Sequence, residues 1–219
     1  IFYFNHAPLR LDGLAVTAPD GSAVAPENVV VGKLRSVFDL NLTQAGTYRV
    51  ANGFSGVTAR YKDAATGQNK GFRGTAENFA KEVPADAPEL TVNEGISRLE
   101  TFITVGKPSA IQSTGKGLEF VPVTHPNDLF TGEAAPFGFL LDWQPAADLE
   151  VEIVFGGTRY RDKVGEMTLK TDAKGQVKVN WPQPGLYRLE ISTKDNKTTL
   201  KQAKERRLVY AAVLEVLPQ

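Results

Sequence analysis

Hydrophobic and polar residues alternate along most of the chain with a period of two. The clearest stretches are 38–42, 149–155, 177–181 and 187–191. This alternation places one face of a strand in a core and the other in water, as in antiparallel sheets. Turn sequences containing Gly or Pro, such as 19–21, interrupt the stretches at short intervals. The pattern therefore predicts an all-β fold of the sandwich or barrel type.

The segment 63–95 lacks this alternation and is rich in Ala, Gly, Asn, Lys and Pro. We interpret it as a long loop excursion between two strands, which is a natural place for a binding loop. Within it, Ala76 to Lys81 is predicted to form one helical turn, because Thr75 is a good N-cap and Glu77 follows it closely.

A short internal repeat relates the two halves of the chain. Residues 36–50 (SVFDLNLTQAGTYRV) and 175–189 (GQVKVNWPQPGLYRL) align without gaps as a strand, the motif Gln-x-Gly-x-Tyr-Arg and an aliphatic residue. A Tyr after such a turn is typical of Ig-like sandwiches, where its ring is buried and its hydroxyl bonds a backbone group. The repeat predicts two tandem Ig-like β-sandwich domains, 1–106 and 107–219, with a boundary near Lys107.

The charge balance excludes one class of partner. Lys and Arg total 25, Asp and Glu also total 25, and the net charge is zero. A nucleic-acid binder needs a basic face to neutralise phosphates, so we expect no nucleic-acid partner. No apolar run reaches the roughly 18 residues that a membrane-spanning helix needs, so we expect no transmembrane segment.

The sequence contains no cysteine, which removes disulfides, thiol catalysis and zinc–thiolate sites. This composition is compatible with an oxidising compartment. The chain opens at Ile1 to Phe4, inside a predicted strand and without an initiator Met. We therefore expect residues upstream that include a removed export signal, and a periplasmic location.

Sequence motifs of catalysis are not found. The sequence has no Gly-x-Ser-x-Gly elbow, no phosphate-binding P-loop and no dinucleotide-binding glycine motif. Glu150 and Glu152 share one face of a strand, and a solvent-facing strand explains them better than a glycosidase pair. Asp142 beside Trp143 suggests a sugar-binding pair, and the favoured alternative is a strand residue before a core Trp. We expect no enzyme activity.

The two histidines are the candidate metal ligands. His6 follows a strand next to Pro8, and His125 leaves another strand shortly before Asp128. A neutral imidazole nitrogen can bind a transition metal, so convergence of His6, His125 and Asp128 would form a divalent metal site. The alternatives are a hydrogen-bonded structural role for His6 and a turn-capping role for His125.

Several segments together resemble one bacterial family. They are the opening Phe2-x-Phe4-x-His6-x-Pro8-Leu9, the strand 46–50 (GTYRV), the entry to the second half at 118–126 (LEFVPVTHP), and the turn sequences 171–175 (TDAKG) and 184–187 (PGLY). In this order and spacing they resemble the DUF4198 family, whose members are described as periplasmic components of cobalt or nickel uptake systems. Turn motifs of this kind are shared with Ig-like and carboxypeptidase-regulatory-like sandwiches.

The resemblance implies export to the periplasm, a divalent transition metal as ligand and envelope transport components as partners. Of the family's histidines, His6 maps onto this chain, whereas the position of His125 is usually another residue. The expected function is a periplasmic, non-catalytic binding or accessory protein associated with transition-metal uptake. The alternative is a structural or protein/glycan-interaction module of the cell envelope.

Overall fold

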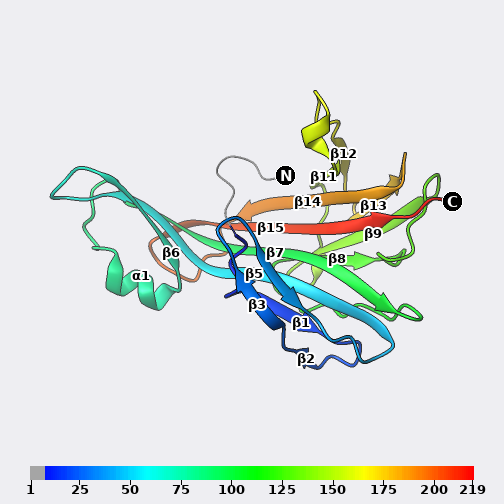
Figure 1. The fold of residues 1–219 in the computed structure, drawn as a ribbon. Coiled ribbons are helices and arrows are strands. Elements are labelled where there is room, and N and C mark those ends of the chain that lie inside the picture. Colours follow the sequence, from blue (N-terminus) through cyan, green and yellow to red (C-terminus); the bar gives the residue numbers. More distant parts are fainter. Residues whose placement is uncertain (1–7) are drawn as a thin grey trace.

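A computed structural model describes residues 8–219, and it confirms the prediction of an all-β sandwich fold (Figure 1). Within these residues, the first half contains seven strands and one helix: β1 Leu14–Thr17, β2 Ala23–Val24, β3 Glu27–Val31, β4 Ser36–Asp39, β5 Gly46–Lys62, β6 Asn69–Gly74, α1 Ala76–Glu82 and β7 Thr91–Val105. The second half contains eight strands and a 3-10 turn: β8 Leu118–Pro122, β9 Ala134–Leu141, β10 Gln144–Pro145, β11 Glu150–Phe155, η1 Thr158–Tyr160, β12 Met167–Lys170, β13 Gln176–Asn180, β14 Gly185–Asp195 and β15 Ala203–Val216.

The largest sheet has nine strands in the order β12–β11–β14–β15–β7–β5–β1–β2, with β6 also paired to β5. Strands β5, β7, β14 and β15 run side by side as its long central ribbon (Figure 1). Its pairings are antiparallel apart from that of β15 with β7, which is parallel. This parallel pair joins the two halves of the chain in one hydrogen-bonded sheet.

Two smaller sheets complete the described fold. Strands β8 and β13 lie on either side of β9, and the short β10 also pairs with β9. This four-stranded sheet packs on the β11–β14–β15 end of the large sheet. Strands β3 and β4 form a separate two-stranded hairpin.

The sequence repeat corresponds to two equivalent corners. Tyr48 and Tyr187 are both 1% exposed. The Tyr48 hydroxyl accepts the backbone N–H of Gln44 at 2.7 Å, and the Tyr187 hydroxyl donates to the backbone carbonyl of Gln183 at 2.8 Å. Each tyrosine therefore ties its strand to the residue four positions upstream, as expected of an Ig-like tyrosine corner.

Burial divides the large sheet into two faces. On β14 and β15, alternate residues such as Leu189 and Tyr210 point into the main core, which also contains Phe137 and Trp181. This core lies between the large sheet and the four-stranded sheet. On β14 and β15, the residues that alternate with these core residues point to the opposite, outer face, because side chains alternate along a strand.

The excursion 63–95 is ordered. It contains β6, which extends β5 as a hairpin, and α1, whose N-cap Thr75 accepts the Asn78 N–H at 3.2 Å. The helix begins at Ala76 as predicted. Phe79 and Val83 from this segment pack on Val57, Ala59 and Val92 in a small separate core. The segment forms an arm at one end of the molecule (Figure 1).

The proposed boundary falls where β7 ends. Gly106 follows it with a φ of 71°, and an irregular segment leads to Leu118 at the start of β8. Because the large sheet contains strands from both sides of this point, the halves share backbone hydrogen bonds. The division into domains 1–106 and 107–219 stays a prediction.

Candidate functional site

A trough lies on the outer face of the large sheet. Its volume is about 960 Å³. The floor consists of Ser97 and Leu99 from β7 and Val209 and Ala211 from β15. These pairs are neighbours across the two strands, since Ser97 pairs with Val209 and Leu99 with Ala211. Three of these four residues are apolar, and the floor lies on two central strands of the sheet.

Two segments form the walls. On one side lies the stretch 8–13, fixed by hydrogen bonds from the Asn52 side chain to the Arg10 carbonyl at 2.6 Å and from the Ser36 hydroxyl to the Leu9 carbonyl at 2.6 Å. On the other side lie the end of β6 and the start of α1, with Arg73 among the lining residues. These walls come from parts of the sequence far from the floor.

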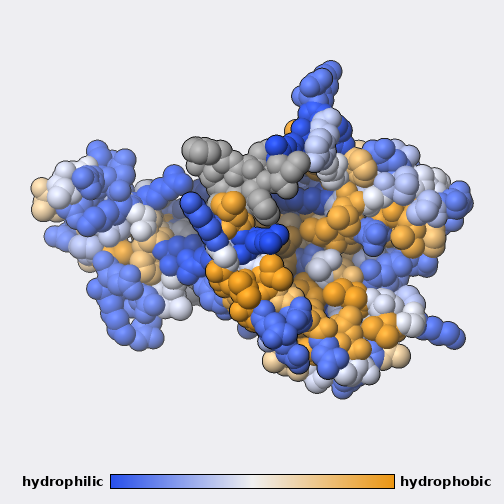
Figure 2. All heavy atoms as spheres, viewed as in Figure 1, coloured by the Kyte–Doolittle hydropathy of each residue, from blue (hydrophilic) through white to orange (hydrophobic). Residues whose placement is uncertain are grey.

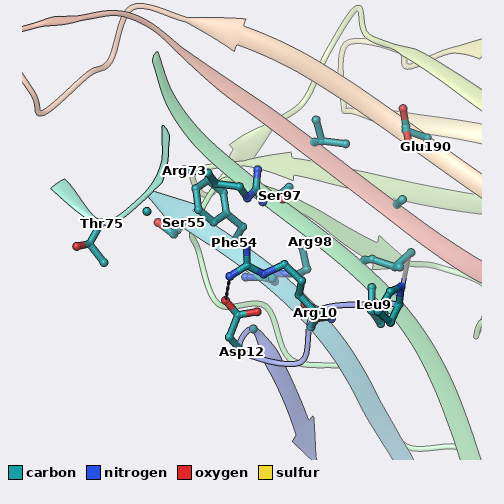
Figure 3. Close-up of a pocket in the computed structure, with 18 of the residues that line it drawn as sticks. Leu9, Arg10, Asp12, Phe54, Ser55, Arg73, Thr75, Ser97, Arg98 and Glu190 are labelled. Carbon is teal, nitrogen blue, oxygen red and sulfur yellow. Dashed lines mark hydrogen bonds and ion pairs between the residues drawn. The ribbon is translucent and has the colours of Figure 1, made fainter. Parts of the chain in front are cut away.

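Arg73 is held over an aromatic ring at one end of the trough. Its guanidinium carbon lies 3.5 Å from the centre of the Phe54 ring, which is a cation–π contact. Figure 3 shows the two side chains against each other, while Arg10 points to Asp12, with a nitrogen–oxygen distance of 3.3 Å. Among residues 8–219 no carboxylate lies within ion-pair distance of Arg73. Its charge is available to an anion in the trough.

The opposite end, on β14, has the reverse charge. Arg188 contacts the Glu190 carboxylate, and it lies 4.0 Å from a carboxylate oxygen of Glu152 on the neighbouring strand β11. Glu152 and Glu190 are direct cross-strand partners. One guanidinium therefore faces two carboxylates, which leaves this end with a net negative charge.

A buried charged cluster beside the trough joins β7 of the large sheet to β8. Arg98 donates to Glu119 at 3.1 Å and lies 3.6 Å from Glu100, so its charge is already neutralised. Burial raises the pKa of Glu100, and Arg98 and Arg49 oppose this rise. The buried Tyr210 hydroxyl donates to Glu100 at 2.9 Å. This cluster is structural, because its charges face one another.

The Glu119 carboxylate accepts three hydrogen bonds from Thr114 and Gly115 in the segment before β8. Burial alone would raise the pKa of its carboxyl, but hydrogen bonds from the Thr114 hydroxyl, the Thr114 N–H and the Gly115 N–H outweigh this and lower the pKa. The carboxylate thus fastens the irregular segment onto the sheet beside Arg98.

The imidazole of His125 is engaged through both nitrogens. The Asn127 N–H donates to Nδ1 at 3.1 Å, so Nδ1 carries no proton, and the protonated Nε2 lies 3.0 Å from the Thr47 hydroxyl. Burial lowers the pKa of His125, which keeps the ring neutral. Asp128 belongs to the same turn, through its backbone N–H to the His125 carbonyl at 2.9 Å. This geometry matches the turn-capping alternative.

The remaining metal candidate, His6, lies outside the described residues. Within residues 8–219, no three His, Cys, Asp or Glu side chains are grouped as ligands of one ion. His125 and Asp128 are close in the fold without a third ligand, and the metal site of His6, His125 and Asp128 stays a prediction.

The structure also shows where Asp142–Trp143 and Glu150–Glu152 lie. Asp142 and Trp143 form the turn between β9 and β10, with φ values of 49° and 68°. Asp142 is ion-paired to Arg206 at 2.6 Å, and Trp143 is 59% exposed. The expectation of a strand residue before a core Trp is therefore wrong, because the paired strands turn here. Glu150 and Glu152 are exposed on β11, as expected of a solvent face.

The trough residues carry no recognisable motif. Arg73 and Phe54 are far apart in sequence, and Arg188 and Glu190 look like the wet side of an alternating strand. One feature of the sequence does indicate a covered surface here. The run 208–214 is apolar without alternation, which is typical of a strand covered on both faces.

The fold and trough define an all-β sandwich protein with a ligand-sized hollow on its sheet. The chain belongs to the DUF4198 family, described as a domain of unknown function, which matches residues 1–195. Among curated proteins, none matches it. Within the part of the chain that the structure describes, no helix has the length and apolar character needed to cross a membrane.

Proposed function

We propose that this protein is a non-catalytic binding protein of the cell envelope, which holds an organic anion in the trough. The observation that carries the proposal is Arg73, which lines the trough over Phe54 and has no carboxylate partner among residues 8–219. A ligand site of this kind is concave and largely apolar, with few charged groups that fix orientation. The periplasmic location and the absence of catalysis remain part of the proposal.

Calorimetric titration with succinate and citrate tests the proposal on the full chain. We expect binding that Arg73→Gln weakens about tenfold or more, since a charge-assisted hydrogen bond contributes about 1.5–3 kcal/mol. The matched control is Arg60→Gln, an exposed arginine of β5 outside the trough, which should leave binding unchanged. Absence of binding, or equal losses in both variants, would refute an anion site at Arg73.

The association with transition-metal uptake is the finer part of the proposal. It is supported by the family resemblance and by His6. Titration of nickel and cobalt ions into the full chain and into His6→Ala, His125→Ala and Asp128→Asn tests it. A shared site predicts weaker metal binding in each of the three variants. Loss of binding in His6→Ala alone would assign the ion to His6 without His125 and Asp128. If the parent chain binds neither nickel nor cobalt, the metal part of the proposal is refuted.

A second candidate function, an interaction module of the envelope, is favoured by the β3–β4 hairpin. Its four valines are prominently exposed, with Val30 at 61%, and they are Val29, Val30, Val31 and Val37. Figure 2 shows apolar residues gathered over the region of β3 and β1. Sedimentation of the parent chain and of Val30→Lys tests it: association that the lysine abolishes supports a module that binds through this hairpin.

A further inference from the structure

The two ends of the trough differ in charge, and this difference limits the class of ligand that fits it. At the β5 end, Arg73 over Phe54 offers an unpaired positive charge. At the β14 end, Glu190 and Glu152 share the single guanidinium of Arg188 and leave one negative charge in excess. A dianion such as succinate would be attracted at the Arg73 end alone, whereas a ligand with one negative and one positive group would be attracted at both ends.

The separation of the ends follows from the sheet. The trough crosses β5, β7, β15 and β14 in that order. Asn52 of β5 pairs with Leu99, Leu99 with Ala211, and Ala211 with Glu190 of β14. Three strand spacings of about 4.8 Å give about 14 Å between Asn52 and Glu190. Phe54, beneath Arg73, lies two residues, or about 7 Å, further along β5, so its Cα lies about 16 Å from that of Glu190. An extended peptide of four to five residues has about this length, at about 3.3–3.6 Å per residue.

Between the charged ends the lining offers no unpaired charge, because Arg98 of β7 is paired with Glu119 and Glu100. Ser97, Leu99, Val209 and Ala211 line the floor. Small apolar side chains of a ligand can lie on this surface and remove it from water, while its charged groups reach the ends. Figure 3 shows Glu190 on β14, on the far side of the β7 and β15 ribbons from Arg73 and Phe54.

We propose that the trough binds a short peptide with free termini, its C-terminal carboxylate on Arg73 and its N-terminal ammonium group on the Glu190–Glu152 pair. This inference rests on the proposed function and names the ligand class of the same trough. Arginine suits a carboxylate because its planar guanidinium donates two parallel hydrogen bonds. The Phe54 ring beneath Arg73 holds the guanidinium in place for that contact.

The test uses tetra-alanine in three forms, with free termini, with an N-terminal acetyl group and with a C-terminal amide, titrated calorimetrically into the full chain. The free peptide should bind, and each cap should weaken binding about tenfold, since each removes one charge-assisted contact. Arg73→Gln should abolish the discrimination against the amide and keep that against the acetyl group. The double variant Glu152→Gln/Glu190→Gln should abolish the discrimination against the acetylated peptide and keep that against the amide.

Control variants Arg60→Gln and Glu150→Gln remove exposed charges from β5 and β11 outside the trough, and should preserve both preferences. Equal binding of capped and free peptides, or no binding of any form, would overturn the inference. If succinate or citrate still bound through Arg73 while the peptides failed, the proposed anion site would stand without the peptide. If none of these ligands bound, both the proposed anion site and the peptide inference would be refuted.

Discussion

Arg206 joins the two sheets of the sandwich by ion pairs with Asp195 and Asp142. Its Nε and Nη2 donate to the two carboxylate oxygens of Asp195 at 3.0 and 2.6 Å. Nη2 also donates to Asp142 at 2.6 Å. Asp195 ends β14 of the large sheet, and Asp142 lies in the β9–β10 turn of the four-stranded sheet. Its side chain is 11% exposed, so solvent screens these ion pairs little.

We predict that Arg206→Gln lowers the free energy of unfolding by about 2 to 4 kcal/mol near pH 7. Removing one partner of a buried ion pair costs about 3–5 kcal/mol. Asp142 and Asp195 keep partial contact with water, at 28% and 19% side-chain exposure, which reduces this value. In a protein of this size 1 kcal/mol corresponds to about 2–4 °C in Tm, so the expected loss is about 6–12 °C for 3 kcal/mol.

The effect depends on pH in a defined direction. Hydrogen bonds from Arg206 lower the pKa of Asp195, and with the Gly117 N–H they lower that of Asp142 against the effect of burial. A carboxyl whose pKa is lower in the folded protein stabilises it above the unfolded pKa, and this stability is lost as the pH falls. The difference between parent and variant should therefore be complete near pH 7 and shrink below about pH 4.

Urea unfolding followed by tryptophan fluorescence, near pH 7 and near pH 3.5, measures both quantities. The matched control is Arg207→Gln on the same strand, whose side chain is 63% exposed and contacts Glu205. An exposed pair of this kind contributes about 0–1 kcal/mol. Equal losses for Arg206→Gln and Arg207→Gln, or a difference unchanged by acid, would refute a buried bridge at Arg206.

Three further changes test the core and the buried polar contacts. Trp181→Ala should cost about 3–5 kcal/mol in urea unfolding, because it opens a cavity in the main core, whereas Trp143→Ala at the exposed turn should cost less than about 1 kcal/mol. Tyr210→Phe leaves the buried Glu100 without its hydroxyl donor and should cost about 1–3 kcal/mol, measured the same way. His125 should titrate below 6.5 by NMR; because burial lowers its folded pKa, its contribution to stability should fall as the pH drops through about 6.5.

Local features of the fold could be predicted from the sequence because local chemistry determines them. The alternation at 149–155 and 177–181 corresponds to β11 and β13. The repeat around Tyr48 and Tyr187 marks two corners in which the tyrosine hydroxyl bonds the backbone four residues upstream, as acceptor in Tyr48 and as donor in Tyr187. The helix at Ala76 follows from its N-cap. Each of these depends on neighbours within a few residues.

The site could not be predicted in the same way, because it depends on pairings between distant segments. Arg73 meets Phe54 because β6 folds back on β5, and the segment 8–13 becomes a wall through its hydrogen bond to Asn52. The turn at Asp142 was missed because two non-glycine residues adopt positive φ there, which sequence patterns seldom indicate.

The run Leu208 to Leu214 explains why the trough lies where it does. A strand that pairs in parallel is usually covered on both faces and is apolar without alternation, and β15 has this character where it pairs with β7. Its residues Leu208 and Tyr210 enter the main core, while Val209 and Ala211 form the floor of the trough. A ligand that covers this floor removes the second apolar face from water, so the parallel pairing that joins the halves also creates the surface on which we propose that the peptide lies.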